Sequence, residues 1–290
     1  MRIAIIGANG QLGNDIVWAY RKSGNTVYEL NHNGVDITDW EICFSKVDKL
    51  RPDLLINTAA MHHVESCEKD PAKAFLVNGI GAKNLALISR ELKIPLVHFS
   101  TDYVFDGVKG SPYVEDDVPA PLNVYGKTKL SGEHFIRNTT DMHFIVRVSG
   151  LYGQSPCRAK GGLNFVKLML RLAGERDEVR VIDDEILSPT YTYDIARQLE
   201  ILTVTKEYGL YHMAAHGSCS WYNFAKKIFE FTRTSIKLNI AHPDEFPAKV
   251  LRPKYSVLNN KALDNLDADV MWHWSEGLKR YLSHLGFRPS

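Results

Sequence analysis

The chain has 290 residues, of which 44% are hydrophobic and 24% charged, and its formal net charge is +1. This composition indicates a soluble globular protein with room for one large domain or two smaller ones. Because the net charge is near zero, we expect no general attraction to nucleic acid or to a membrane surface. No apolar run approaches the ~20 residues of a membrane span, so we expect a cytoplasmic protein. The four cysteines are scattered, which favours reduced thiols over disulfides or zinc.

The first predicted element is a buried strand over residues 2–6, and a glycine-rich loop follows it at once. This loop consists of Gly7, Ala8, Asn9, Gly10, Gln11, Leu12 and Gly13. Apolar residues at helical spacing begin at Leu12. A strand, a glycine loop and a helix in this order are typical of a dinucleotide site, because glycine lets the backbone approach a pyrophosphate and the helix N-terminus supplies amide donors.

A second strand is predicted over residues 26–30, and the residues at its end should meet the ribose of the adenosine. Asn31, His32 and Asn33 stand there, without an acid. An acid would repel a ribose phosphate and a neutral amide would not, so the sequence favours NADPH, with NADH as a second option. The stretch from Asp36 to Asp39 either caps the next helix or holds the adenine edge, and the two roles are compatible.

The rest of the first half continues the alternation of strand and helix. Strands are predicted over residues 53–57, 96–101 and 144–148, with a long amphipathic helix over 72–92. We expect residues 107–123 to form a surface loop whose acidic run, 115–117, is solvated. The adjacent His62 and His63 point apart and have no third ligand nearby, which favours a loop over a metal site. The alternation predicts an α/β fold of the Rossmann type, with a doubly wound parallel sheet.

The second half lacks another glycine fingerprint, and we expect it to supply the substrate side. Its predicted helices cover residues 164–172, 194–204 and 221–231 and a last stretch around Trp274, and its strands cover 179–182 and 210–213. We therefore predict a dinucleotide-binding domain over 1–150, with returning segments near 180–215. A smaller α/β substrate-binding domain would occupy most of 151–290.

Tyr125 and Lys129 are four residues apart, so in a helix both side chains leave the same face. An ammonium group near a phenol favours the phenolate and lowers the pKa of the tyrosine below its usual value of about 10. We therefore expect Lys129 to tune Tyr125 for proton transfer. The pattern is common in helices by chance and gains meaning only from its context.

That context is a resemblance to the extended short-chain dehydrogenases/reductases, and within them to the dTDP-4-dehydrorhamnose reductase family. The stretches that carry the resemblance are the glycine loop and residues 57–60, 100–105, 120–129, 188–190, 220–222 and 252–253. They extend over nearly the whole chain, and their combination is specific. The resemblance implies reduction of the C4 keto group of a nucleotide-activated 6-deoxy sugar.

The resemblance also implies roles for individual residues. Tyr125 matches the proton donor and Lys129 its partner, and Thr101 matches the hydroxyl that holds the substrate carbonyl. Asp102 and Arg252 match substrate contacts, the arginine at a diphosphate. The matching cofactor positions are Gly7, Asn9, Gly10, Gln11, Leu12, Gly13, Asn31, Asp36, Ile37, Ala59, Ala60, Met61, His62, Phe99, Tyr125 and Lys129. The family also allows a homodimer and Mg²⁺, for which Asp15 is a candidate, although a solvated acid on a helix face is favoured there.

The chain departs from the family pattern at three places. Gly150 stands where relatives usually carry a tryptophan that faces the sugar nucleotide, which leaves the exact substrate open. Leu163 replaces the first asparagine of the usual Asn-Asn-Phe motif, and Glu65 replaces the aspartate of the usual Val-Asp pair.

Three alternatives compete with this reductase. A dehydratase would carry Glu after Asp102, where this chain has Tyr103. An epimerase-reductase would need Cys and His near the carbonyl, and Cys157 is the only remote candidate in the sequence. A non-catalytic NADP-binding regulatory subunit stays open, because a fold alone does not fix a function.

Overall fold

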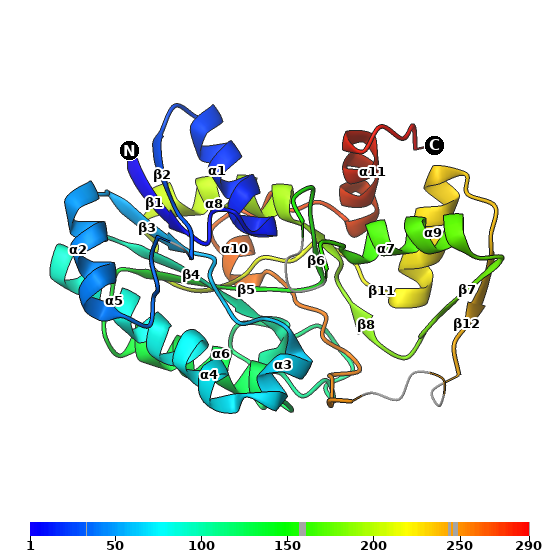
Figure 1. Ribbon diagram of the computed structural model, residues 1–290, viewed down its shortest axis with the longest axis horizontal. Helices are drawn as coiled ribbons and strands as arrows, with labels where there is room; N and C mark the ends of the chain where they lie inside the picture. Colours follow the sequence, from blue (N-terminus) through cyan, green and yellow to red (C-terminus); the bar gives the residue numbers. More distant parts are fainter. Residues whose placement is uncertain (33, 157–160, 243–244, 246–248, 290) are drawn as a thin grey trace.

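The computed structural model describes residues 1–32, 34–156, 161–242, 245 and 249–289. Its larger part is built on a six-stranded parallel sheet (Figure 1). In order across the sheet, the strands are β2 (Thr26–Leu30), β1 (Arg2–Ile6), β3 (Leu54–Asn57), β4 (Leu96–Thr101), β5 (His143–Val148) and β10 (Gly209–His212). The order reverses beside β1, so the sheet is doubly wound, and ligands of such sheets bind outside the carboxyl ends of the strands at this reversal.

Helices cover both faces of the sheet, because alternate residues of each strand point to opposite faces. On one face α1 (Gln11–Lys22) and α8 (Thr192–Thr205) pack on side chains such as Ile3 and Ile5. On the other face α2 (Trp40–Leu50), α5 (Gly81–Leu92) and α6 (Val124–Arg137) pack on Ala4, Leu55 and Ile145. Figure 1 shows these two helical layers above and below the sheet. The predicted α/β fold of the Rossmann type is confirmed.

The long helix predicted over residues 72–92 is present but interrupted. It consists of α4 (Pro71–Phe75), a π-helical turn over Leu76–Ile80, and α5. The side chain of Asn78, within this turn, bonds both the N–H and the C=O of Met61 at 2.9 Å. Short π segments often occur at functional sites, and this one anchors a loop that carries predicted cofactor residues. Helix α3 (Val64–Lys69) directly follows that loop.

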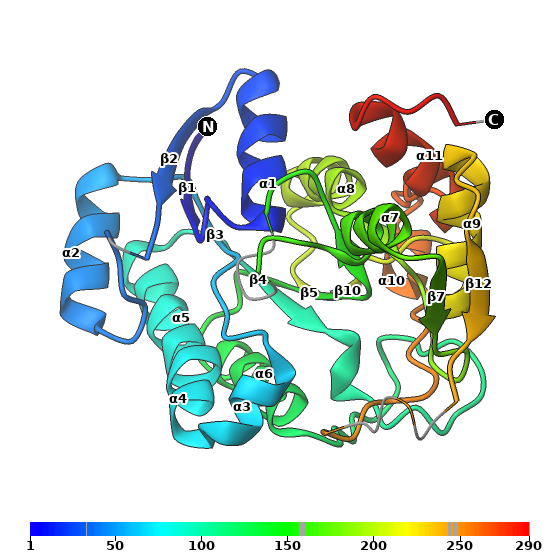
Figure 2. The ribbon, with the colours of Figure 1, turned by 45° about the vertical axis from the view of Figure 1, so that its right-hand side comes forward.

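A second, smaller lobe lies beside the sheet, and Figures 1 and 2 place it on the side of the molecule away from α2. Its core gathers aromatic side chains such as Tyr152, Tyr191 and Phe224. Its main elements are α7 (Phe165–Glu175), α9 (Trp221–Thr232), α11 (Trp274–His284), β7 (Glu178–Val181) and β12 (Lys237–Ile240). Smaller pieces are β6 (Leu151–Tyr152), β8 (Ile186–Leu187), β9 (Thr190–Tyr191), β11 (Cys219–Ser220) and α10 (Lys261–Asp264).

The predicted elements of the second half all occur, with ends that differ from the prediction by at most three residues. Both α8 and β10 return to the sheet of the first half. The division near residue 150 stays a prediction. No helix among the described residues is long and apolar enough to cross a membrane.

The expectation that residues 115–117 are merely solvated is wrong. Oε1 of Glu115 accepts hydrogen bonds from the backbone N–H of His212 and of Ala262, at 2.8 and 3.2 Å. Asp117 caps the turn at Val114, and Asp116 pairs with Lys261. The acidic run therefore fastens this loop to β10 and α10, because their backbone N–H groups need acceptors.

Candidate active site

A cavity of about 1000 Å³ opens at the carboxyl ends of β1, β3 and β4 and is lined by both lobes. It brings together almost every residue selected from the sequence. These are Gly7, Asn9, Gly10, Gln11, Leu12, Gly13, Asp36, Ile37, Ala59, Ala60, Met61, His62, Phe99, Thr101, Asp102, Tyr125, Lys129 and Arg252. Its position agrees with the place where doubly wound sheets bind ligands.

Asn31 is the selected residue that does not line this cavity. Its Oδ1 accepts a hydrogen bond from the backbone N–H of Asn9 at 3.1 Å, so Asn31 helps to hold the glycine loop in place. Its neighbour His32 lines the cavity instead, and Asn33 lies outside the described residues. Asp36 also lines the cavity, while Asp39, three residues on, caps α2 through the N–H of Ile42.

The glycine loop has the geometry that a dinucleotide requires. A Cβ on Gly13 would lie 2.3 Å from the carbonyl oxygen of Gly7, so only glycine allows this packing of helix on loop. Helix α1 begins after Gly10, and no side chain caps its N-terminal N–H groups. The helix start and its loop line the cavity, which leaves amide donors and the positive end of the helix dipole available to a pyrophosphate. The described residues therefore fit the cofactor that the sequence predicts.

Thr101 and Asp102 form a buried polar cluster where β4 ends. The Asp102 carboxylate accepts hydrogen bonds from Thr101 Oγ1 at 3.0 Å, Ser149 Oγ at 2.8 Å and Ser256 Oγ at 2.6 Å. Burial raises the pKa of Asp102 to about 6, and the three hydroxyl donors oppose that rise. Asp102 thus orients Thr101 and joins β4 to the segment that follows β5 and to the C-terminal region.

Tyr125 lies in the first turn of α6, where Asn123 caps the helix by accepting from the N–H of Gly126 at 2.9 Å. Burial raises the pKa of Tyr125 above its usual value, a hydrogen bond with Thr101 lowers it, and the charge of Asp102 raises it. The expectation that Lys129 lowers the pKa of Tyr125 is wrong for this structure. The physical reason is that desolvation outweighs the favourable contacts and that Lys129 is engaged elsewhere.

Lys129 is buried, with a relative exposure of 2%. Its Nζ lies 3.1 Å from Nε2 of His98, on β4. Burial lowers the pKa of Lys129 to about 8, and the charge of Glu133 opposes this shift. Tyr125 and Lys129 therefore share one cavity wall, as the spacing predicts, but their charges are set by burial.

The second lobe contributes a polar and aromatic wall to the same cavity. Arg252 reaches across to Glu65 on α3, with Nη2 2.5 Å from the carboxylate oxygen Oε1. Trp221 donates from Nε1 to Glu185 at 3.1 Å, and the ring of Phe165 packs on that of Trp221 with 4.5 Å between centroids. A cation beside flat aromatic rings suits a nucleoside diphosphate.

Comparison with known proteins agrees with this geometry. The model of the family "RmlD substrate binding domain" matches residues 1–287. The chain belongs to this family. It is 39% identical to the spore coat polysaccharide biosynthesis protein SpsK of Bacillus subtilis, over 97% of this chain and 96% of that protein. It is 36% identical to a dTDP-4-keto-6-deoxy-D-glucose reductase of Streptomyces niveus, over 96% and 95%.

A solved structure supports the same assignment to the RmlD family. It is the dTDP-4-dehydrorhamnose reductase of Bacillus anthracis in complex with NADP, with a TM-score of 0.93 and 39% identity. The match covers 98% of this chain and 99% of that one.

Several residues at this RmlD-type site were not selected from the sequence. Ser149 and Ser256 bind Asp102, and His98 contacts Lys129. Ser256 follows the recognised Arg252 and Pro253, and Ser149 follows β5, so position alone could have suggested them. His98 gave no signal, because a histidine inside an apolar strand looks like a core residue.

Gly150 stands where the resemblance predicts a tryptophan, and the backbone there leaves no room for a side chain. It lines the cavity with φ of +56°, and a Cβ there would lie 3.0 Å from Cα of Pro189. A side chain at this position is incompatible with the backbone as it stands.

The structure does not support Mg²⁺ at this site. Among the residues it describes, no group of three or more His, Cys, Asp or Glu side chains could hold a metal ion. Asp15 is not a solvated acid either: it is buried and accepts a hydrogen bond from Thr192 Oγ1. Burial raises the pKa of Asp15 to about 6.

Three of the four cysteines lie among the residues that the structure describes. Cys43, Cys67 and Cys219 are buried and free, while Cys157 lies outside the described residues. The sequence predicts no cysteine near the reacting groups, but the structure brings Cys67, on α3, close enough that its thiolate form would raise the pKa of Tyr125. Burial raises the pKa of the Cys67 thiol to about 11, so it stays protonated.

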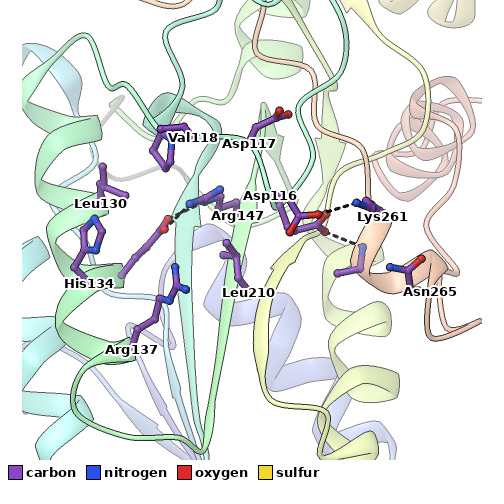
Figure 3. Close-up of a pocket in the computed structure, with 14 residues that line it drawn as sticks. Asp116, Asp117, Val118, Leu130, His134, Arg137, Arg147, Leu210, Lys261 and Asn265 are labelled. Carbon is purple, nitrogen blue, oxygen red and sulfur yellow. Dashed lines mark hydrogen bonds and ion pairs between the residues drawn. The ribbon is translucent and has the colours of Figure 1, made fainter.

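A second cavity, of about 580 Å³, lies where α6 and α10 flank β5 and β10. Figure 3 shows Arg147 among its lining residues, with Arg137 and His134 on one side and Lys261 on the other. Arg147 forms a buried bidentate ion pair with Glu133, at 3.0 Å from Nε and 2.7 Å from Nη2. Glu133 also accepts a hydrogen bond from Ser100, which lines the large cavity.

Proposed function

We propose that the protein is an NADPH-dependent oxidoreductase that reduces the C4 keto group of a nucleotide-activated 6-deoxy sugar. The substrate we favour is dTDP-4-dehydro-L-rhamnose, which would give dTDP-L-rhamnose. The observation that carries the proposal is the convergence of Thr101, Tyr125 and Lys129 on the cavity that also contains the glycine loop. The relative with bound NADP supports NADPH as the cofactor.

In this reaction the bound cofactor supplies hydride to the C4 carbon, and the chain's own residues handle the oxygen. On substrate binding, Thr101 would turn its single hydroxyl hydrogen from the Asp102 carboxylate, to which it donates at 3.0 Å, to the carbonyl oxygen. Tyr125 would give the proton that this oxygen needs as its negative charge develops. The raised pKa of Tyr125 keeps the phenol protonated at neutral pH, and the alkoxide that develops on the substrate is the stronger base that would take this proton. One preorganised donor of this kind contributes on the order of 3 kcal/mol to transition-state stabilisation.

On the substrate side, Arg252 would bind the diphosphate as the resemblance implies, and Phe165 and Trp221 would contact the nucleoside. The pairing of Arg252 with Glu65 means that a diphosphate must displace a carboxylate. The name of the Bacillus subtilis relative is consistent with a product used for a cell-surface polysaccharide.

A different 4-keto sugar nucleotide is the second candidate, because Gly150 alters the cavity wall and because one relative is named for dTDP-4-keto-6-deoxy-D-glucose. The test is to follow NADPH and NADH oxidation at 340 nm with each of the two dTDP sugars. Turnover with dTDP-4-dehydro-L-rhamnose supports the first candidate. Turnover with the other sugar alone selects the second, and cofactor binding without turnover on either favours the regulatory subunit.

A further inference from the structure

The first turn of α6, which carries Tyr125, is held through backbone N–H groups on both sides of that residue. The N–H of Val124 donates to Oε1 of Glu68 on α3 at 2.8 Å, and the N–H of Gly126 donates to Oδ1 of Asn123 at 2.9 Å. The first N–H groups of a helix have no acceptor within the helix, so these two side chains fix the place where the turn begins. Figures 1 and 2 show α3 beside α6.

The packing of Gly126 leaves this turn little freedom to shift. A Cβ on Gly126 would lie 2.1 Å from the carbonyl oxygen of Tyr103 and 2.9 Å from Cβ of Pro121. The ring of Tyr125 also packs edge-on against that of Tyr103, with 5.9 Å between centroids. Because close-packed segments transmit displacements, a movement of the groups that cap the turn should reach the Tyr125 side chain.

The segment that carries Arg252 is connected to both of these capping groups. The Nδ2 of Asn123 donates to the C=O of Leu251 at 2.9 Å. Arg252 pairs with Glu65, which lies on α3 three residues before Glu68. Two connections therefore join this segment to the start of α6, a direct one through Asn123 and an indirect one through α3.

The two connections differ in what a bound diphosphate does to them. A diphosphate at Arg252 must displace the carboxylate of Glu65, whereas the bond of Asn123 to Leu251 involves neither charged group. We propose that Asn123 is a positioning residue that couples occupancy of the diphosphate site to the placement of the Tyr125 hydroxyl. The inference rests on the proposed function, because it takes Arg252 as the diphosphate ligand and Tyr125 as the acid.

Asparagine is suited to this role because one amide group makes both contacts. A backbone N–H only donates and a backbone C=O only accepts, so the oxygen of Asn123 faces Gly126 and its NH₂ group faces Leu251. The side chain is 2% exposed, so water does not compete for either contact. Through this coupling, binding energy from the unreactive diphosphate would align the acid with the carbonyl oxygen and appear in kcat.

Asn123→Ser separates the two contacts. Serine caps a helix about as well as asparagine and is uncharged, but it has no NH₂ group to reach Leu251 while its oxygen holds the Gly126 N–H. The side chain of Leu251 is exposed, so its backbone oxygen lies close to solvent and we expect the variant to fold. Asn123→Ala removes both contacts and should have a lower Tm than Asn123→Ser.

Steady-state kinetics with NADPH and the preferred sugar nucleotide test the role in catalysis. We expect kcat of Asn123→Ser to fall about 10- to 100-fold, as for a misplaced reacting group, while the Kd for dTDP changes less than about twofold. Asn265→Ser, the same change at an exposed position, should behave as the unmodified protein. If serine at position 123 restores kcat together with Tm, the residue only caps the helix and the proposal is wrong. Weaker dTDP binding with normal kcat would also contradict it.

Hydrogen exchange of the Gly126 N–H tests the coupling without turnover. In the full-length protein we expect dTDP to slow this exchange by about fivefold or more, because occupancy of the site stabilises the cap. In Asn123→Ser the hydroxyl still accepts from Gly126, but dTDP should leave the exchange unchanged. An equal effect of dTDP in both proteins, or none in the unmodified one, would overturn the coupling and leave the reductase standing.

Slowed exchange without turnover on either dTDP sugar has the opposite meaning. It would remove the proposed reaction and keep the coupling between the diphosphate site and the start of α6. Absence of any dTDP binding by the unmodified protein would contradict both proposals.

Discussion

Ser256 Oγ donates a hydrogen bond of 2.6 Å to the carboxylate of Asp102, although 154 residues separate the two in the sequence. The contact joins the C-terminal region that carries Arg252 to the end of β4. Ser256→Ala removes one of three donors to a buried carboxylate, which should raise the pKa of Asp102 further. We expect a loss of unfolding free energy of about 1–3 kcal/mol at pH 8.

The loss in Ser256→Ala should shrink as the pH falls below about 6, where Asp102 is protonated in the folded state and needs fewer donors. Urea unfolding of Ser256→Ala and of the unmodified protein at pH 5 and pH 8 measures this loss of unfolding free energy. Ser283→Ala on the surface of α11, whose hydroxyl bonds Lys279 within the same helix, is the control. A loss of equal size at both pH values would show that the carboxylate charge is not involved.

Gly13 packs directly against the loop that precedes it, and an added Cβ would meet two backbone atoms, the Gly7 oxygen at 2.3 Å and Ala8 Cα at 2.9 Å. Gly13→Ala must therefore displace the loop, at a cost of about 1–3 kcal/mol in unfolding free energy. If the loop binds NADPH, affinity should fall by at least tenfold. NADPH fluorescence titration and thermal unfolding report the two effects.

Gly174→Ala is the matched control for Gly13→Ala, because Gly174 lies on the exposed face of α7 with open space around its Cα. Replacing glycine by alanine inside a helix should stabilise the protein by about 0.5–1 kcal/mol and leave NADPH binding unchanged. Equal behaviour of the two variants would argue against the packing explanation.

The sheet and the glycine loop could be predicted because both depend on local sequence. Residues 3–6 of β1 are continuously apolar, and α1 follows its loop immediately. The polar partners of the site could not be predicted, because they come from distant parts of the chain. No periodic pattern in the sequence predicts the contact of Ser256 with Asp102 or that of Glu65 with Arg252. Each contact forms only because the fold brings distant segments together.

The charge states could not be predicted from spacing either. The distance of four residues between Tyr125 and Lys129 predicts their shared face but not their burial. Burial disfavours the charged form of both groups, so it raises the pKa of Tyr125 and lowers that of Lys129. Burial also explains why Asp15, which was expected on a solvated helix face, has a raised pKa.

Asp15 should make stability depend on pH. Its folded pKa of about 6 exceeds the unfolded value of about 3.9, so the folded state binds the proton more tightly. Its contribution therefore falls as the pH rises from about 4 to about 6 and is flat above. Asn in its place can still accept from Thr192 and carries no charge. Asp15→Asn should be more stable than the unmodified protein at pH 7, by on the order of 1–3 kcal/mol.

Thermal unfolding of Asp15→Asn and of the unmodified protein between pH 4 and pH 8 measures this difference. The gap in Tm should open across pH 4–6 and then stay constant. Asp102 also has a pKa raised to about 6 by burial, but both proteins contain it, so its effect cancels in the comparison. The charge of Asp15 contributes to the raised pKa of Asp194, so its removal should add to the stability gained over the same pH range. A gap that is constant over the whole range would contradict the raised pKa of Asp15.

The ion pair of Arg252 with Glu65 predicts opposite effects on ligand binding for the two partners. If Arg252 binds a diphosphate, Glu65→Gln removes its competitor and should tighten dTDP binding several-fold. Arg252→Ala should weaken it by about tenfold, as expected for loss of a charge-assisted contact. Calorimetric titration with dTDP gives both values, and Glu175→Gln, from an exposed pair on α7, is the control. If Glu65→Gln bound dTDP more weakly than the unmodified protein, the diphosphate would not bind at Arg252.

Tyr125→Phe tests the acid itself. It removes a hydroxyl in contact with Thr101 and leaves the ring, whose edge packs on Tyr103 at 5.9 Å between centroids. Since a positioned general acid contributes about 10²–10⁴-fold, kcat for NADPH oxidation with the preferred sugar nucleotide should fall by that factor. NADPH affinity and Tm should change little. Tyr208→Phe, whose ring packs on Phe144 far from the cavity, should retain full activity.

Thr101→Val makes the same test at the carbonyl oxygen and should lower kcat about 10²–10³-fold, the cost of one lost donor. Because Thr101 and Tyr125 act on one oxygen, the double variant should be scarcely slower than Tyr125→Phe alone. Fully multiplicative losses would mean that the two hydroxyls act in separate steps. Ordinary turnover by Tyr125→Phe would show that another group donates the proton, and the assignment of this site as a Tyr-based reductase would then be wrong.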